Sequence, residues 1–339
     1  MCKILIGHNS QRDFFKKAIS NDRLSHAYIF TGISGIGKML FALNLSKSLL
    51  CDNQLFFEKC NCRQCIDIDN FIHPDVHIYS GRKIIKNEKE EKEENQLKVE
   101  NIREIIEISN ESTIIGKYKI FILDDADRLA GTGQGVAANA FLKTLEEPAP
   151  NTIFILVTSK LDLMLPTIKS RCNIINFNSL NKSEIEEVFI QNDFFKKDEI
   201  NDNLEIKEEI ENDSIDFSSI FENNKLKEDI YKISNGSVSR IIKLTELHIY
   251  SIIEKILNGN FIEFRKDVMK INDINTLRLL IESIYPLSLD RFKKSNKMIF
   301  SNYGDYLLEL LGKFNYNINL DLTKNNFVSI SIEVFSERI

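Results

Sequence analysis

A glycine-rich segment that ends in lysine, Gly32-Ile33-Ser34-Gly35-Ile36-Gly37-Lys38, limits the possible folds of this chain more than any other feature. It follows an apolar run and precedes an amphipathic stretch, so the context predicts a strand, a tight loop and a helix. Glycines let backbone N–H groups surround phosphate oxygens, a helix N-terminus attracts anions, and a lysine ammonium neutralises phosphate charge. We therefore predict a phosphate-binding loop built by Gly32, Gly35, Gly37 and Lys38, with an unrelated glycine-rich turn as the alternative.

Short apolar runs alternate with amphipathic stretches throughout the first half of the chain. This alternation is typical of a parallel sheet covered by helices, which makes the expected fold class α/β. Proline residues fall in this half where such a domain needs turns. The predicted strands are Ala27–Thr31, Val76–Ser80, Lys119–Asp124, Ile153–Thr158 and Ile174–Phe177, and the predicted helices are Lys38–Leu50, Val99–Ser109 and Val136–Leu145.

The second half changes character after about Leu180, where helical spacing replaces the β-branched runs and predicts an all-helical region. Two polar segments interrupt the pattern. We interpret the charged run Lys86–Asn95 as a solvated loop or exposed helix, and the acidic segment Gln191–Asn224 as a loosely held insertion or a helix pair.

The composition indicates an ordinary globular chain, because 43% of its 339 residues are hydrophobic and 28% are charged. No stretch approaches the ~18 apolar residues of a membrane helix, so we expect a cytoplasmic protein whose cysteines are thiols or metal ligands. The net charge of −6 argues against a generally basic nucleic-acid-binding surface. Residues 191–232 hold thirteen acids and six bases, so the rest of the chain is near neutral. Charge therefore neither supports nor excludes a local basic face for DNA.

A second part of a nucleotide site is predicted after the buried run 120–123, where Asp124 and Asp125 follow directly. Asp124 is placed to hold Mg²⁺ through water, and Asp125 to polarise the attacking water, although ATPases of this type usually carry the longer Glu there. The residue after the loop lysine is Met39, whose thioether cannot replace the usual Ser or Thr hydroxyl on Mg²⁺. We expect phosphate binding to survive while hydrolysis is weak or absent. A core strand that ends in a solvated acidic turn is the alternative.

Four closely spaced cysteines, Cys51, Cys60, Cys62 and Cys65, lie between the first two predicted strands. Zn²⁺ takes such Cys₄ sets in tetrahedral structural sites, so we predict that these four thiolates bind zinc. Free cysteines are the alternative. Cys2 and Cys172 lie apart from this cluster and are interpreted as packing residues.

The order of these motifs resembles that of the bacterial clamp-loader subunits of DNA polymerase III, and within that family of the delta-prime subunits. The resemblance is strong from about Ile4 to Leu180 and weaker beyond. It rests on the loop, the cysteine cluster, His73-Pro74-Asp75, Gly116-Lys117-Tyr118-Lys119, Asp124-Asp125-Ala126-Asp127, the segment from Ala138 to Leu145-Glu146-Glu147-Pro148, and Leu165-Pro166-Thr167-Ile168-Lys169-Ser170-Arg171-Cys172.

The resemblance implies an AAA+ P-loop module over residues 1–178, a helical lid over 179–246 and an all-helical collar over 247–339. It implies a pentameric ring with tau/gamma and delta subunits that opens the beta sliding clamp and loads it on primed DNA. Arg171 matches the arginine finger that reaches a neighbouring subunit's nucleotide, a role that suits its permanent charge and planar fork. Thr158 matches the position that senses nucleotide state.

Several departures from the family pattern bear on function. Met39 and Asp125 weaken the nucleotide site, the arginine of Gly236-Ser237-Val238-Ser239-Arg240 comes one residue later than in hydrolysing relatives, and one residue instead of two separates Cys60 from Cys62. Together they favour a stator that supplies a finger in trans. A tau/gamma-type ATPase motor, and a nucleotide- or zinc-stabilised nucleic-acid-binding protein outside the replisome, remain alternatives.

Overall fold

The computed structural model describes residues 4–80, 99–131, 136–192, 224–295, 297–314 and 319–336. The chain forms two compact units, Met1–Val188 and Phe189–Ile339, which are described separately. No helix within the described ranges is long and apolar enough to cross a membrane. The charged run 86–95, Cys2 and residues 193–223 of the acidic segment lie outside the described residues.

The first unit contains a five-stranded parallel sheet in the order β2-β3-β4-β1-β5. All five predicted strands are present, although β4 starts one residue earlier than expected and β5 is shifted by one. The predicted α/β class is confirmed. The strands are β1 Ala27–Thr31, β2 Val76–Ser80, β3 Lys119–Asp124, β4 Thr152–Thr158 and β5 Asn173–Asn176.

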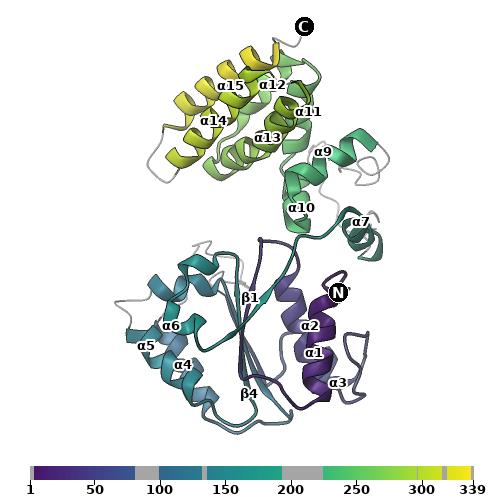
Figure 1. The fold of residues 1–339 in the computed structure, drawn as a ribbon, viewed down its shortest axis with the longest axis vertical. Helices are drawn as coiled ribbons and strands as arrows, with labels where there is room; N and C mark the ends of the chain where they lie inside the picture. Colours follow the sequence, from purple (N-terminus) through teal and green to yellow (C-terminus); the bar gives the residue numbers. More distant parts are fainter. Residues whose placement is uncertain are drawn as a thin grey trace, which may run out of the picture. The chain divides into compact units, whose positions relative to one another are not determined.

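Helices cover both faces of this sheet, with α1, α2 and α3 on one side and α4, α5 and α6 on the other (Figure 1). All three predicted helices form, and α5 extends one residue further than expected. The helices are α1 Asn9–Ser20, α2 Lys38–Leu50, α3 Arg63–Asp69, α4 Val99–Ser109, α5 Val136–Glu146, α6 Pro166–Lys169 and α7 Lys182–Gln191, with short 3-10 turns η1 Ala126–Gly131 and η3 Leu161–Leu163.

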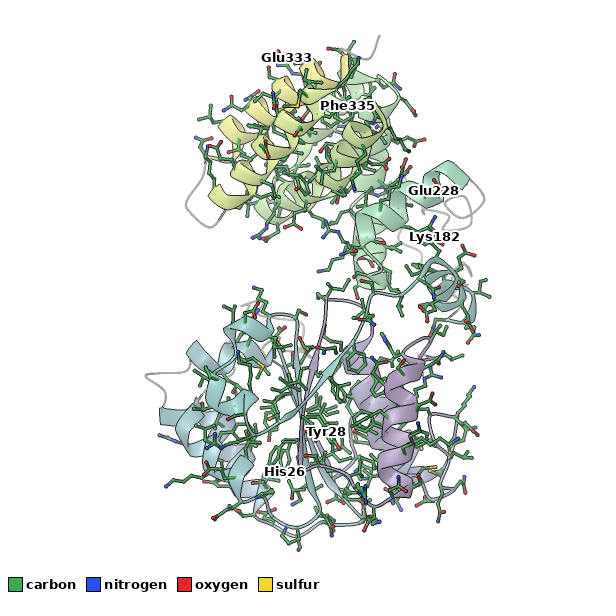
Figure 2. The ribbon with its side chains drawn as sticks, in the orientation of Figure 1. His26, Tyr28, Lys182, Glu228, Glu333 and Phe335 are labelled. Carbon is green, nitrogen blue, oxygen red and sulfur yellow. The ribbon has the colours of Figure 1, made fainter. Side chains whose placement is uncertain are left out.

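Alternate side chains of each strand enter two separate cores. Tyr28 and Phe30 of β1 pack with Phe41 of α2 on one face, and Ile29 packs with Ile105 of α4 on the other. Tyr28 lies among these packed side chains in Figure 2. Because both faces of the sheet are covered, the sequences of β1 and β4 are continuous apolar runs rather than alternating ones. These runs made the two strands easy to predict from the sequence.

The second unit is helical throughout its described residues, as the spacing predicted. Leu277, Leu280, Ile281 and Ile284 recur at helical spacing, and each is at most 1% exposed in the shared core. The division into lid and collar at residue 246 stays a prediction. The helices are α9 Asn224–Ser234, α10 Val238–Glu246, α11 Ile249–Leu257, α12 Phe261–Lys270, α13 Ile274–Ser295, α14 Met298–Lys313 and α15 Leu320–Ser336.

Candidate nucleotide and metal sites

The glycine-rich loop connects β1 directly to α2, as predicted. Gly32, Gly35 and Gly37 all adopt positive φ angles, at 145°, 79° and 98°. A Cβ atom at Gly32 would lie 2.3 Å from the carbonyl oxygen of Phe177, so any larger residue here would force the backbone to shift. The loop therefore passes close to the chain that follows β5.

The N-terminus of α2 supplies the anion-binding element of this loop. Gly37 is the N-cap residue, and the N–H of Phe41 bonds to its carbonyl oxygen at 2.8 Å. The N–H groups before Phe41 have no carbonyl partner inside the helix, because the first turn of any α-helix leaves them unpaired. These amides and the positive end of the helix dipole fit a phosphate group.

Lys38 is almost completely buried, at 5% exposure. Its ammonium donates hydrogen bonds to the carbonyl oxygens of Gly32 at 2.7 Å and Ile33 at 2.6 Å, and to the Oγ of Ser159 at 3.1 Å. Burial lowers the pKa of Lys38 to about 8, although the nearby carboxylates of Asp124, Asp125 and Asp127 oppose this shift. The lysine thus stabilises the loop, and a phosphate would compete with the two carbonyl oxygens for its N–H groups.

The predicted acidic residues lie at the carboxyl end of β3. The backbone N–H of Asp125 donates to the Oδ1 of Asp124 at 3.0 Å, and the carboxylate of Asp125 lies 3.8 Å from the guanidinium of Arg128. Thr158, the last residue of β4, donates through Oγ1 to the Oδ1 of Asp127 at 2.7 Å. Asp124, Asp125 and Thr158 therefore lie at the carboxyl ends of their strands, on the same side of the sheet as the loop, and Asp127 is the partner of Thr158.

Met39 bears on whether this site can hold Mg²⁺. It follows Lys38 in α2, and its partly buried side chain packs against the core, so this position offers no hydroxyl ligand. Asp124 and water remain as oxygen ligands. The residues present therefore fit a phosphate group better than they fit a tightly held Mg²⁺.

The four cysteines predicted as metal ligands come together at the end of α2 and the start of α3. Their Sγ atoms all lie within 4.8 Å of one another, and those of Cys51 and Cys62 are 4.0 Å apart. The backbone N–H of Cys62 lowers the pKa of Cys60 to about 7, whereas burial raises the pKa of Cys51 and Cys65. Although one residue instead of two separates Cys60 from Cys62, their thiols still lie beside those of Cys51 and Cys65. The four cysteines could therefore hold a metal ion.

Hydrogen bonds connect Gln64, which lies between Cys62 and Cys65, with the segments that precede β2 and β3. His73 Nε2 lies 2.5 Å from the Oε1 of Gln64 in α3, and His73 Nδ1 accepts from the N–H of Asp75 at 3.1 Å. The completely buried Asp75 carboxylate accepts the N–H groups of residues 114, 115 and 116 at 2.7–2.8 Å. Sequence reasoning used His73-Pro74-Asp75 only as a sign of resemblance and missed this structural role.

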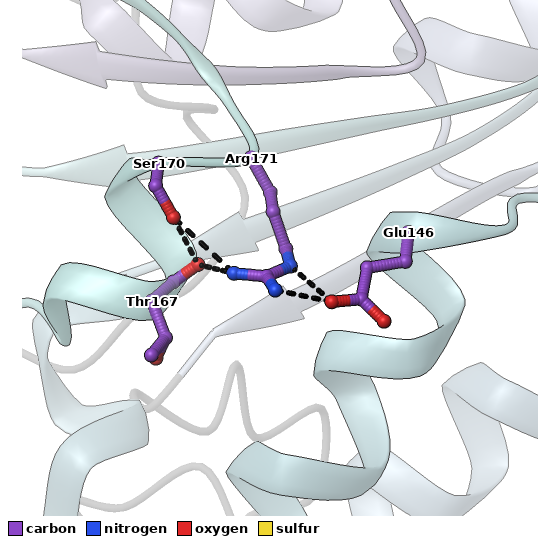
Figure 3. A network of polar contacts seen from close by, with 4 residues as sticks. All are labelled: Glu146, Thr167, Ser170 and Arg171. Atoms are coloured by element: carbon purple, nitrogen blue, oxygen red, sulfur yellow. Dashed lines mark hydrogen bonds and ion pairs between the residues drawn. The ribbon is translucent and has the colours of Figure 1, made fainter.

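Arg171 lies between α6 and β5, at the amino end of the sheet. Its guanidinium contacts Glu146, Thr167 and Ser170, and its side chain is 31% exposed (Figure 3). Cys172 beside it packs partly buried against the core, as expected for a packing residue.

Arg240 lies in the second unit, where its guanidinium is 3.4 Å from the carboxylate of Glu282. Its backbone N–H bonds to the hydroxyl of Ser237, the N-cap of α10, at 3.2 Å. The shifted arginine is therefore a partner of Glu282 within its own unit.

The parallel sheet, the phosphate-type loop after β1, the acidic edge after β3 and the helical second unit define an AAA+ P-loop protein. The family described as "DNA polymerase III, delta subunit" matches residues 7–181, which is more than half of the chain. The chain therefore belongs to this family of clamp-loader subunits.

Individual relatives agree with this family. DNA polymerase III subunit delta' of Bacillus subtilis (strain 168) is 34% identical over 177 residues, which are 52% of this chain and 49% of the relative. Subunit delta' of Escherichia coli (strain K12) is 33% identical over 48% of this chain and 46% of the relative, and subunit gamma/tau of Mycoplasma genitalium is 29% identical over 77% and 40%. The chain thus spans about half the length of these relatives, or less.

Among solved structures, a DNA polymerase III gamma subunit-related protein from Thermotoga maritima aligns over 96% of this chain and 99% of its own. The TM-score is 0.47 and the sequence identity is 20%.

Proposed function

We propose that this chain is a delta-prime-type clamp-loader subunit of DNA polymerase III, which acts mainly as a stator in the cytoplasm. In this proposal it joins tau/gamma and delta subunits in a pentameric ring that opens the beta sliding clamp and loads it on primed DNA. Its own ATP hydrolysis is weak or absent, and it supplies Arg171 as an arginine finger to a neighbouring subunit's nucleotide.

One topological observation carries the proposal for Arg171. β1 and β5 are neighbouring parallel strands, with Thr31 paired to Asn176 at their carboxyl ends. The phosphate-type loop follows Thr31, whereas Arg171 precedes β5, so the two lie at opposite ends of the strand pair. At about 3.3 Å per residue, roughly 15 Å of strand separates these ends. This separation supports action in trans and disfavours action on a phosphate bound to the chain's own loop.

Two features of the candidate nucleotide site support weak hydrolysis. Met39, which is partly buried against the core, offers no hydroxyl to Mg²⁺, and the shorter Asp125 carboxylate pairs with Arg128. A misplaced water-polarising group costs on the order of 100-fold in rate. Both features favour the stator over the tau/gamma-type motor as the role of this chain.

The proposal is tested in a complex assembled from this chain, tau/gamma, delta and the beta clamp on primed DNA. For Arg171→Ala we expect normal assembly, with turnover at the nucleotide site that it serves falling on the order of 10³-fold. The exposed Arg103→Ala serves as the matched control and should hydrolyse ATP like the wild type. Unchanged hydrolysis by the complex with Arg171→Ala would contradict the arginine-finger role. Substantial ATPase activity of the isolated chain would favour the tau/gamma-type motor. Failure to join tau/gamma and delta would favour a nucleic-acid-binding protein outside the replisome.

A further inference from the structure

The guanidinium of Arg171 is already bound within its own chain (Figure 3). Its Nε donates to the Oε1 of Glu146 at 2.8 Å, and its Nη2 donates to the same oxygen. Its Nη1 donates to the carbonyl oxygen of Thr167 at 2.8 Å and lies 3.2 Å from the Oγ of Ser170. Glu146 is therefore the charged partner of the proposed finger.

These contacts leave little of the guanidinium for another anion. An arginine presents its N–H groups as two forks, one formed by Nε and Nη2 and the other by Nη1 and Nη2. Glu146 occupies the first fork, and the backbone oxygen of Thr167 takes a donor of the second. A phosphate that binds both donors of one fork must displace Glu146 or Thr167. Of these two partners, only the Glu146 carboxylate is negatively charged, as the phosphate is.

The position of Glu146 does not favour the helix that carries it. Glu146 is the last residue of α5, where the negative end of the helix dipole disfavours a carboxylate. The pairing with Arg171, which comes 25 residues later, offsets that cost and links α5 to the segment between α6 and β5. The pair is also easy to open, because Glu146 is 48% and Arg171 31% exposed and such pairs contribute little.

We propose that Glu146 is a positioning residue that holds Arg171 back until a neighbour's triphosphate displaces the carboxylate. This inference rests on the proposed function of Arg171 and adds a restraint that the ring must overcome before the finger acts. Glu146→Gln keeps the shape of the side chain and removes its charge. The restraint then weakens, and Arg171 engages the neighbouring nucleotide more readily.

The first test uses the isolated chain and does not depend on the ring. Phenylglyoxal modifies accessible guanidinium groups, and mass spectrometry reports its rate at Arg171. We expect Glu146→Gln to react about two- to five-fold faster at Arg171, the range that an exposed ion pair accounts for. The neighbouring Glu147→Gln, which makes no ion pair with Arg171, should react like the wild type. An unchanged rate of modification at Arg171 in Glu146→Gln would overturn the proposal that Glu146 restrains this arginine.

The second test measures ATP hydrolysis by the assembled complex without the clamp. Glu146→Gln should raise kcat about two- to five-fold with little change in KM and in the thermal stability of the chain. The double variant with Arg171→Ala should match Arg171→Ala alone, because Glu146 acts only through that arginine. A loss of activity in Glu146→Gln, or an effect that persists without Arg171, would overturn the proposal. If Arg171→Ala alone changes nothing, the proposed function itself fails.

Discussion

The ammonium of Lys38 lies 3.1 Å from the Oγ of Ser159, although 121 positions separate the two residues in the chain. The contact exists because β1 and β4 are neighbours, so the loop after β1 meets the residue that follows β4. Ser159 directly follows Thr158, which bonds to Asp127. A ligand that moves Lys38 would therefore disturb the carboxyl end of β4 and, through Thr158, the turn after β3.

The buried lysine predicts a pH-dependent affinity for nucleotide. Its pKa is about 8, below the ordinary 10.5, and a phosphate binds the ammonium rather than the neutral amine. ADP affinity of the wild type should therefore fall above about pH 8, approaching tenfold per pH unit. Lys38→Met should bind ADP more weakly at pH 7 and lack this decline. Calorimetric titration between pH 6.5 and 9.5 measures both, and a pH-independent wild type would contradict the prediction.

The cysteine cluster predicts about one zinc ion per chain, since four thiolates complete a closed tetrahedral site. Replacing Cys60 and Cys62 by Ser should abolish zinc binding and lower the midpoint of thermal unfolding. Cys172→Ser, which lies outside the cluster, is the control and should retain the metal. Elemental analysis provides the measurement, and a wild-type protein purified without metal would show that these are free cysteines.

Asp75 predicts a specific loss of stability in acid. Burial alone would raise the pKa of Asp75, but the N–H groups of residues 114–116 outweigh it and hold the pKa below its ordinary value of 3.8. The contribution of the ionised carboxylate is thus fully present above about pH 4 and is lost as the pH falls through the lowered pKa.

For Asp75→Asn we expect about 1–3 kcal/mol lower stability at pH 7, because at least one buried N–H group loses its acceptor. The difference from the wild type should shrink below pH 4. Urea unfolding at pH 7 and pH 3 measures both values, and an equal difference at the two pH values would show that the charge of Asp75 is unimportant.

The sequence predicted those features that depend on neighbouring residues. Apolar runs located the strands β1, β3 and β4 because both faces of the sheet are covered there, and local spacing identified the loop glycines and the cysteines. Contacts between distant segments, such as Lys38 with Ser159 and Arg171 with Glu146, left no local pattern.

Some helices also escaped prediction. The helix α1 is absent from the predicted elements, and Phe15 is its only fully buried side chain. The helical region predicted from spacing includes α13, although Pro286 lies inside it and local propensity disfavours a helix there by about 3 kcal/mol. The packed residues on either side of it, such as Ile284 and Leu287, outweigh that preference.

The close approach of Gly32 to the chain after β5 predicts that a side chain at this position is more harmful than at an ordinary glycine. At φ 145° and with a Cβ atom only 2.3 Å from the Phe177 oxygen, Gly32→Ala must shift the loop away from the chain after β5. We expect a loss of roughly 1–3 kcal/mol, together with weaker ADP binding, because the strain falls on the phosphate-type loop. Gly312→Ala is the matched control, since it lies in α14 with open space around it and should raise stability by about 0.5–1 kcal/mol. Urea unfolding measures the change in stability of both variants. A loss for Gly32→Ala and a gain for Gly312→Ala would support the role of the loop geometry. Equal losses would show that replacing any glycine has this effect.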